Sequence, residues 1–396
     1  MSDSGSRRCP ICDGLGRRLI HRQRFIDGPM GDGYNVVVCT QCGAGFADGI
    51  PSQAEMDRYY IEQSKYTYDH ADGAESTWDL KRFEATVGQI AHYLKSRNAR
   101  ILDIGCATGG LLSVFKKSGF ENVMGVDPSP ACAEAAGRLH GVKVLVSTLF
   151  QLTDWEERFD LILMLGVLEH LREVKDAVRV ASRLLTQGGH IYCAVPDVEG
   201  LASCSNAPYQ QFSIEHVNFF SISSLERLMS ECGMVEEHAW IWTVEWREKI
   251  LEPIVSGLYK PKSVPMHQLF DERTGPAMER YLAFSKEGDR KIHTVIDSLR
   301  SSQEPILVWG AGTLARRLLA TTRFAEANIA AFVDSNPHLQ GHVLADRVIL
   351  APRQLKGRNE SVVICSVTFA KEIAGAIRYQ YGYFNRMISL LGEDLC

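Results

Sequence analysis

The sequence has no hydrophobic run long enough to cross a membrane. Its longest uninterrupted apolar stretch lies near residues 161–168, whereas a membrane-spanning helix needs about 20 such residues. Residues 1–8 also lack the apolar core of a signal peptide. We therefore expect a cytoplasmic protein without a membrane partner.

Long basic runs, internal repeats and low-complexity tracts are missing as well. The 396-residue chain has a formal net charge of −5, whereas a nucleic-acid-binding protein needs a concentrated basic face. At about 150 residues per domain, this length predicts two or three domains. We expect no nucleic-acid partner.

Disulfides are not expected among the eleven cysteines, because cytosolic thiols stay reduced. Four cysteines form two Cys-x-x-Cys pairs, Cys9 with Cys12 and Cys39 with Cys42. Two such pairs build a tetrahedral zinc site, and a shell of four thiolates leaves no open position for catalysis. The 26 residues between the pairs exceed the usual spacing of roughly 15–20, and a hairpin there would accommodate the difference. We predict a structural Zn²⁺ site; a redox pair or a chance arrangement is the alternative.

A strand, a glycine-rich turn and a helix follow one another between residues 101 and 118. The turn reads Asp103-x-Gly105-x-x-x-Gly109-Gly110, which differs from the Gly-x-Gly-x-x-Gly of dinucleotide-binding folds. Glycine lets the backbone approach a ligand closely because it has no Cβ. The acid two residues before the first glycine suits a ligand with an ammonium group rather than a pyrophosphate. The stretch resembles motif I of class I S-adenosylmethionine (SAM) methyltransferases.

The strands that follow keep the register of such a fold. Asp127 ends the second strand, where a carboxylate accepts hydrogen bonds from ribose hydroxyls. The fourth strand, 159–164, leads into Val167-Leu168-Glu169-His170. A NAD site is the alternative for the glycine turn alone. The resemblance implies SAM as the cofactor and assigns its contacts to Asp103, Gly105, Cys106, Gly109, Asp127, Thr148 and Leu165.

Two polar and aromatic stretches are candidates for a substrate site. Residues 210–220 precede a helix, so Glu215 and His216 lie on a loop of the kind that carries chemistry. Residues 65–70 contribute Tyr66 and Tyr68. The alternatives are a lid over the cofactor for the first stretch and ordinary packing for the second. His170 is better explained by a place beside the cofactor than by a role as a base.

A second strand, glycine turn and helix begin at residue 306. The turn is Gly310-Ala311-Gly312, and the next strand ends at Asp334. Renewed alternation of strands and helices predicts a Rossmann-like domain. Because a lone Gly-x-Gly is a weak signal, we favour a scaffold that encloses the substrate pocket over an independent cofactor site.

The order of these parts resembles the deoxysugar C-methyltransferases of antibiotic pathways over nearly the whole chain. The matching residues are the four cysteines of the two Cys-x-x-Cys pairs, called the zinc knuckle below, together with Tyr66, Tyr68, 215–219, 310–312 and 333–341. The resemblance implies an α/β protein in which a doubly wound class I methyltransferase sheet is flanked by a small zinc-knuckle domain and a C-terminal Rossmann-like domain. The predicted domains are 1–60 (zinc binding), 61–245 (SAM-dependent methyltransferase), 246–300 (helical linker) and 301–396 (Rossmann-like).

The same resemblance implies methylation of carbon 3 in a 4-keto nucleotide-linked sugar, through an enolate. His216 would be the general base, since an imidazole titrates near neutral pH, and Glu215 would orient it or bind a sugar hydroxyl. Tyr68 would donate to the 4-oxygen, with Tyr66 or Tyr209 as substitutes. Residues 69–72 and 309–315 depart from the family's pattern. Because both segments would face the substrate, the acceptor could differ.

Three alternatives remain open. An O- or N-methyltransferase on another small molecule needs the same SAM site but no carbon acid. A zinc-knuckle RNA-modifying or RNA-binding protein would need a basic face, and a SAM-binding sensor would not catalyse. The sequence leaves open the acceptor and the oligomeric state, a monomer included.

Overall fold

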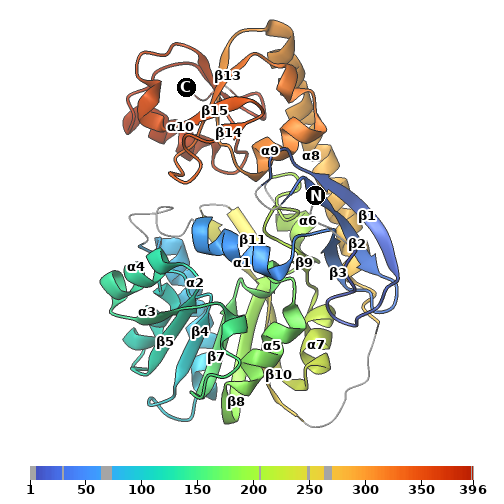
Figure 1. Ribbon diagram of the computed structural model, residues 1–396, viewed down its shortest axis with the longest axis vertical. Coiled ribbons are helices and arrows are strands. Elements are labelled where there is room, and N and C mark those ends of the chain that lie inside the picture. The colour runs from blue at the N-terminus through green and yellow to red at the C-terminus, as the bar shows by residue number, and fades with distance from the viewer. Residues whose placement is uncertain are drawn as a thin grey trace. The chain divides into compact units, whose positions relative to one another are not determined.

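Figure 1 shows the computed structural model, which describes residues 6–28, 31–63, 74–204, 207–247, 250–262, 270–393 and 395. The chain divides into two compact units. Unit 1 comprises Met1–Ile20, Val36–Cys204 and Glu215–Glu279, and unit 2 comprises His21–Asn35, Ser205–Ile214 and Arg280–Cys396. The described residues form three β-sheets.

A seven-stranded sheet forms the centre of unit 1. Its strand order is β10-β11-β8-β7-β4-β5-β6. Strands β4 to β8 are parallel, whereas β11 runs antiparallel to both β8 and β10. The bounds are β4 Ile101–Ile104, β5 Val123–Asp127, β6 Lys143–Val146, β7 Phe159–Leu165, β8 Leu185–Pro196, β10 Met234–Arg247 and β11 Ile250–Pro261. This order is that of the class I methyltransferase sheet, which confirms the predicted fold class.

The central strands are buried on both faces. In β7, Leu161 and Leu163 contribute to one hydrophobic cluster, while Ile162 and Met164 contribute to another on the opposite face. Successive side chains of a strand point to opposite faces, so a strand covered on both sides reads as a continuous apolar run. The apolar stretch that is too short for a membrane therefore belongs to the core of the sheet.

Helices precede and connect the strands of this sheet. Helix α2 begins at a capping box, in which Ser76 Oγ accepts from Asp79 N and the Asp79 carboxylate accepts from Ser76 N. The helices of unit 1 are α1 Gln53–Gln63, α2 Thr77–Ile90, α3 Gly110–Lys117, α4 Pro130–His140, α5 Val174–Arg183, α6 Leu201–Cys204 and α7 Ile222–Glu231. Among the described residues, none of the helices combines the length and the apolar character that a membrane span requires.

The predicted helical linker is wrong over its first part. Residues 250–261, which we expected between the two α/β domains, form β11 in the seven-stranded sheet. The helix expected after them is present as α8, Thr274–Ser302. The division into domains at residues 60, 245 and 300 otherwise stays a prediction.

A small four-stranded sheet follows the order β1-β2-β3-β9. Its strands are β1 Arg17–Arg24, β2 Gly33–Cys39, β3 Gly45–Asp48 and β9 Asn218–Phe219. Strand β9 pairs antiparallel with β3, and Phe46 lies opposite Asn218. The segment after His216 is therefore tied to the N-terminal sheet.

The third sheet lies in unit 2 and has the order β14-β15-β13-β12-β16-β17. All its pairs are parallel except β14 with β15. Its strands are β12 Ile306–Trp309, β13 Ile329–Val333, β14 Val343–Leu344, β15 Arg347–Leu350, β16 Ser361–Ile364 and β17 Met387–Ser389, with helices α9 Thr313–Thr321 and α10 Ala370–Tyr379. The predicted C-terminal Rossmann-like fold is confirmed.

Candidate functional site

The glycine-rich turn after β4 has a backbone that other residues would strain. Gly105 and Gly109 have φ values of 70° and 81°, in the left-handed region that glycine adopts without cost. A Cβ on Gly105 would lie 2.9 Å from Cγ2 of Val167, and one on Gly109 would lie 3.1 Å from Cβ of Ala136. Both glycines are therefore required by conformation and by close packing.

Two carboxyl groups are buried beside this turn. Asp103 is 4% exposed and Asp127 is 7% exposed. Backbone N–H groups of Ala107 and Ser129 donate to the two oxygens of Asp127, each at 2.9 Å. Burial raises the pKa of Asp127 to about 6, and burial together with the charge of Asp127 raises the pKa of Asp103 well above its usual value. A cationic ligand rich in hydroxyl groups would offset the cost of these buried charges.

The other residues predicted to contact the cofactor lie at the same edge of the sheet. Leu165 ends β7, and Thr148 follows β6 and caps a short 3-10 helix together with Gln151. Parallel strands bring their carboxyl ends to one edge, so these residues lie at the same edge of the sheet as the turn after β4. Cys106 is buried, and a Cβ on Gly125 would overlap its Sγ atom. Its side chain is directed at β5, and its backbone is held within the turn, where Cys106 N donates to Val126 O at 3.3 Å and Cys106 O accepts from Gly109 N at 2.9 Å.

Two histidines and a glutamate gather at the carboxyl end of β7. The rings of His170 and His216 meet edge to face, with centroids 4.8 Å apart. One ligand-type atom from each of Glu169, His170 and His216 lies within 4.8 Å of the others. This group lies near the glycine turn. Val167, two residues before Glu169 in the chain, packs its side chain against Gly105. Residues 46 positions apart, as His170 and His216 are, thus form one cluster.

Burial favours the neutral form of the Glu169 carboxyl group. Glu169 is 3% exposed, and its Oε2 atom has no hydrogen-bond partner among the described residues. Burial raises its pKa to about 8. Oε1 of Glu169 lies 3.9 Å from Nε2 of His170. A protonated carboxyl next to two imidazoles can serve as a proton reservoir.

The histidine segment is positioned by backbone hydrogen bonds. Val217 N donates to Glu169 O at 2.7 Å, and Ala47 N donates to Val217 O at 2.9 Å. Strand β9 then pairs with β3. Glu215 and His216 are therefore fixed between the turn after β7 and the small sheet, and the prediction of a loop just ahead of helix α7 is correct.

Two tyrosines that the sequence analysis missed complete this cluster. Tyr59 Oη donates to Oε1 of Glu215 at 2.9 Å. At Nδ1 of His170 lie the hydroxyl of Tyr60 at 2.9 Å and the carbonyl oxygen of Glu215 at 3.2 Å. A carbonyl only accepts, so its bond assigns the proton to Nδ1 and leaves Nε2 as the acceptor. The adjacent phenols near the end of α1 were the available signal.

Of the tyrosines chosen from the sequence, only Tyr209 lies among the described residues. Tyr66 and Tyr68 lie outside the described residues. Tyr209 belongs to unit 2, where its ring stacks on His21 at 5.0 Å and lies 4.6 Å from the guanidinium carbon of Arg317. Its hydroxyl pKa is raised by burial.

The four predicted zinc ligands converge in unit 1. The sulfurs of Cys9 and Cys42 are 3.5 Å apart, those of Cys12 and Cys39 are 3.6 Å apart, and all four lie within 4.8 Å of one another. Hydrogen bonding to Cys39 raises the pKa of Cys42, and with burial it raises the pKa of Cys9 to about 12. Four converging cysteine sulfurs are a donor set that fits a tetrahedral zinc ion.

Residues 79–238 match a protein-family profile described as "Methyltransferase domain". Over 99 residues the chain is 38% identical to a ubiquinone biosynthesis O-methyltransferase of Alkalilimnicola ehrlichii. The aligned region covers 23% of this chain and 39% of that protein. Over 156 residues it is 28% identical to a tRNA U34 carboxymethyltransferase of Pseudomonas aeruginosa, covering 37% of this chain and 48% of that protein. The chain thus spans less than half the length of these curated relatives.

Solved methyltransferase structures resemble part of the chain. The CcbJ methyltransferase from Streptomyces caelestis is 15% identical, with a TM-score of 0.40 and coverage of 52% of this chain and 98% of that chain. A 1,6-didemethyltoxoflavin-N1-methyltransferase from Burkholderia thailandensis is 19% identical, with a TM-score of 0.41. The alignment covers 56% of this chain and 97% of that chain.

The chain therefore contains a SAM-dependent methyltransferase domain, and this family implies SAM as the cofactor. The residues of the turn fit that cofactor, because its backbone takes the left-handed conformation that glycine allows and two buried carboxyl groups lie beside it. Asp127 would accept from the ribose hydroxyls, and Asp103 would balance the positive charge.

Proposed function

We propose that the protein is a SAM-dependent methyltransferase that methylates carbon 3 of a 4-keto nucleotide-linked sugar. One observation supports this proposal most. A pair of histidine rings, His170 and His216, lies 4.8 Å apart next to the turn that fits the cofactor. Attack by carbon requires removal of a ring proton, and a paired imidazole is suited to that step. The sugar class rests on the resemblance carried by the knuckle cysteines and by residues 215–219 and 333–341.

SAM supplies a methyl group on a positively charged sulfur. The chain has to hold the acceptor carbon in line with that methyl group and exclude water. His216 accepts the proton from carbon 3, which leaves an enolate whose charge collects on the 4-oxygen. General bases of this kind contribute roughly 10²–10⁴-fold to the rate.

The neighbours of His216 have supporting roles in this mechanism. Glu215, bonded to Tyr59, binds a sugar hydroxyl or orients the base. Tyr68 or Tyr66 donates to the developing 4-oxygen. His170, whose Nδ1 atom is fixed by Glu215 O and Tyr60, supports the ring of His216 as its edge-to-face neighbour. Cys9, Cys12, Cys39 and Cys42 would hold Zn²⁺ in a structural role.

Solvent exchange tests the base directly. A dTDP-linked 4-keto-deoxysugar, incubated in D₂O with the enzyme and S-adenosylhomocysteine, should gain deuterium at carbon 3. His216→Asn should lower this exchange and methyl transfer by roughly 10²–10⁴-fold, while calorimetric affinity for S-adenosylhomocysteine stays unchanged. His238→Asn is the control, because His238 lies in β10 with its ring 4.3 Å from that of Trp240. Equal loss of cofactor affinity in His216→Asn would reduce this residue to a lid.

Methylation of a small-molecule hydroxyl is a second candidate. The similarity to ubiquinone biosynthesis O-methyltransferases favours it. His216 would then deprotonate oxygen rather than carbon. A thermal-shift panel of dTDP-, UDP- and GDP-linked sugars, with S-adenosylhomocysteine present, separates the two candidates. Stabilisation by none of these sugars, with a methoxy product from a phenol, would favour O-methylation.

A further inference from the structure

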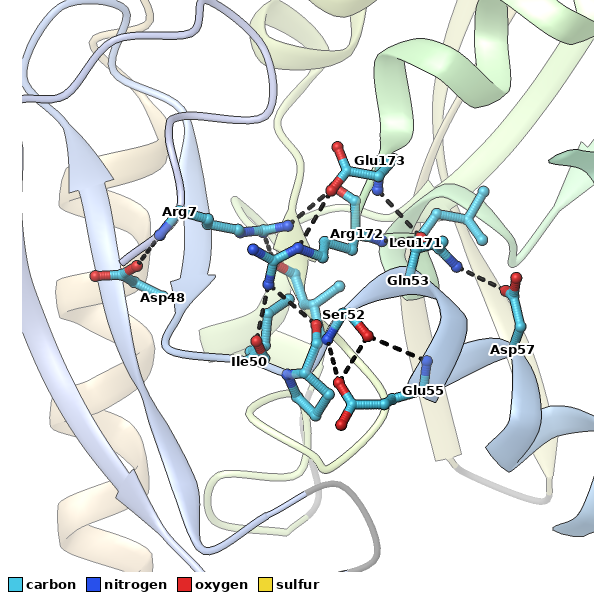
Figure 2. A network of polar contacts seen from close by, with 12 residues as sticks. Arg7, Asp48, Ile50, Ser52, Gln53, Glu55, Asp57, Leu171, Arg172 and Glu173 are labelled. Carbon is cyan, nitrogen blue, oxygen red and sulfur yellow. Dashed lines mark hydrogen bonds and ion pairs between the residues drawn. The ribbon is translucent and has the colours of Figure 1, made fainter. Parts of the chain in front are cut away.

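Arg7 is a buried arginine that belongs to the N-terminal knuckle. It lies two residues before Cys9 and is only 7% exposed. Its backbone N–H donates to Oδ1 of Asp48 at 2.8 Å, which fixes the start of the knuckle to the end of β3. Its guanidinium extends towards the turn that carries Arg172 and Glu173 (Figure 2).

The guanidinium binds both segments that carry the histidine pair. One terminal nitrogen donates to Val217 O at 2.8 Å and to Oδ1 of Asn218 at 2.9 Å. The other donates to Arg172 O at 3.1 Å. Val217 follows His216 directly, and Arg172 lies two residues after His170. One side chain thus bridges the two stretches of chain on which the histidines lie.

Asn218 extends this bridge to the backbone around His170. Its side-chain nitrogen donates to Leu168 O and Leu171 O, each at 2.7 Å. Because Arg7 occupies the amide oxygen, the amide nitrogen is directed at these two carbonyls. The bond from Val217 N to Glu169 O adds a further link between the same segments.

Burial of a cation of this kind costs free energy, so its position calls for another explanation than stability. The three hydrogen bonds of the guanidinium go to uncharged oxygens, and the ring of Phe46 lies 5.2 Å from its central carbon. Burial without a directly bonded carboxylate gains little Coulomb energy against the desolvation of the charge. What the planar fork provides is geometry, since it holds several acceptors in fixed directions.

We propose that Arg7 is a positioning residue that holds His216 against His170, so that the four-cysteine knuckle is part of the catalytic apparatus and not only a stabilising domain. Only the catalytic meaning of the histidine pair depends on the proposed function. The positioning itself is a property of Arg7, Val217 and Asn218. Loss of the knuckle's metal would release Arg7 and, with it, the segment 215–218.

Histidine NMR of the full-length, zinc-loaded protein tests this positioning without an acceptor. Ring signals of His216 and His170 are assigned from His216→Asn and His170→Asn. In Arg7→Gln, both signals should shift, and the titration midpoint of His216 should move by about half a pH unit or more, because small changes around an imidazole move its pKa. Zinc content and affinity for S-adenosylhomocysteine should match the wild type.

Arg17→Gln is the matched control. Arg17 donates to Oδ2 of Asp48 at 2.7 Å and to Arg7 O at 3.3 Å, so it belongs to the same knuckle without contacting the histidine segments. Its removal should leave both ring signals in place. If Arg7→Gln does not fold, Arg7→Lys, which keeps the cation without the fork, carries the same test.

Chemical rescue adds a second readout. In Arg7→Ala, turnover on the dTDP-linked 4-keto-deoxysugar should fall on the order of 10²-fold with KM for SAM unchanged, as for a misplaced catalytic group. Ethylguanidinium should restore part of it. Unchanged histidine signals in Arg7→Gln, or equal shifts in Arg17→Gln, would overturn the proposal. Normal turnover in His216→Asn would instead overturn the proposed function and leave the signal shifts as they are.

Discussion

The carboxyl group of Glu169 is buried, so its ionisation destabilises the folded state. Its pKa is raised to about 8 by burial, whereas the carboxyl group has its ordinary value in the unfolded chain. The folded protein therefore holds this proton more tightly than the unfolded one. As pH rises from about 4.5 to 8, this group makes the free energy of unfolding fall by about 1.4 kcal/mol per pH unit. Above pH 8 both states are ionised and the penalty is constant.

Replacement of this carboxyl group should remove the pH-dependent penalty. Glu169→Gln should gain stability relative to the wild type between pH 5 and 8, measured by urea unfolding at each pH, and the gain should level off above pH 8. Glu173→Gln, at the surface beside Arg172, is the control. A stability difference for Glu169→Gln that stays flat across this range would contradict the assignment of a neutral carboxyl.

At the residue scale, the sequence was informative wherever the chemistry depends on short spacing. Asp103, Gly105 and Gly109 lie within seven positions, so the turn geometry follows from the local pattern. The proximity of Tyr59 to Glu215 spans 156 positions. No local signal encodes that distance, because it depends on how α1 and the segment before β9 pack in the folded protein.

Gly43 determines the backbone conformation next to the second Cys-x-x-Cys pair. Its φ is 84°, and a Cβ there would overlap the carbonyl oxygen of Asp271. The backbone at this point is further tied by the bond from Asp271 N to Cys42 O at 2.8 Å. Gly43→Ala would therefore combine left-handed strain with a clash against rigid backbone.

The knuckle variant can be compared with a glycine of similar backbone conformation. Gly49 has φ of 80° and nothing within 4 Å of an added Cβ. Gly49→Ala should cost roughly 1–2 kcal/mol, the strain alone, whereas Gly43→Ala should cost clearly more and lower zinc content. Chemical unfolding and metal analysis check this. Equal losses in the two variants would show that the Asp271 contact is unimportant.

At the element scale, strand β11 shows where sequence reasoning failed. Pro253 and Pro261 suggest a broken helical linker, because proline disrupts regular structure locally. Residues 254–259 pair with β8, so Pro253 lies just before the stretch that is paired on both sides and Pro261 lies beyond it. Proline is tolerated at such flanking positions. Only the tertiary pairing reveals the strand between them.

At the scale of the whole molecule, removal of the proposed zinc ion should loosen the segments near the cysteines and leave the seven-stranded sheet intact. Stripping zinc with a chelator should raise amide hydrogen exchange at Ala47 and Val217, which hydrogen-bond across the two segments. The amides of β4, β5 and β7 should keep their protection, and affinity for S-adenosylhomocysteine should persist. Zinc re-addition should restore the exchange pattern. Exchange that rises equally throughout the seven-stranded sheet would mean that the knuckle only stabilises the fold.

Each unit contains a glycine turn whose backbone N–H donates to the acid at the end of the next strand. In unit 1, Asp127 accepts from Ala107 N at 2.9 Å, and in unit 2, Asp334 accepts from Ala311 N at 2.8 Å. Each acid also accepts from a backbone N–H two residues further on. Burial raises the pKa of Asp334, as it does that of Asp127. Geometry at the acid alone therefore does not distinguish the two turns, whereas the family match lies over the first.

Calorimetric titration with S-adenosylhomocysteine of the wild type, Asp127→Asn and Asp334→Asn tests this assignment most directly. The account predicts one site per chain, a loss of about 10- to 100-fold in affinity for Asp127→Asn, as expected for hydrogen bonds to a charged group, and no change for Asp334→Asn. Full affinity in Asp127→Asn, or its loss in Asp334→Asn, would contradict the account.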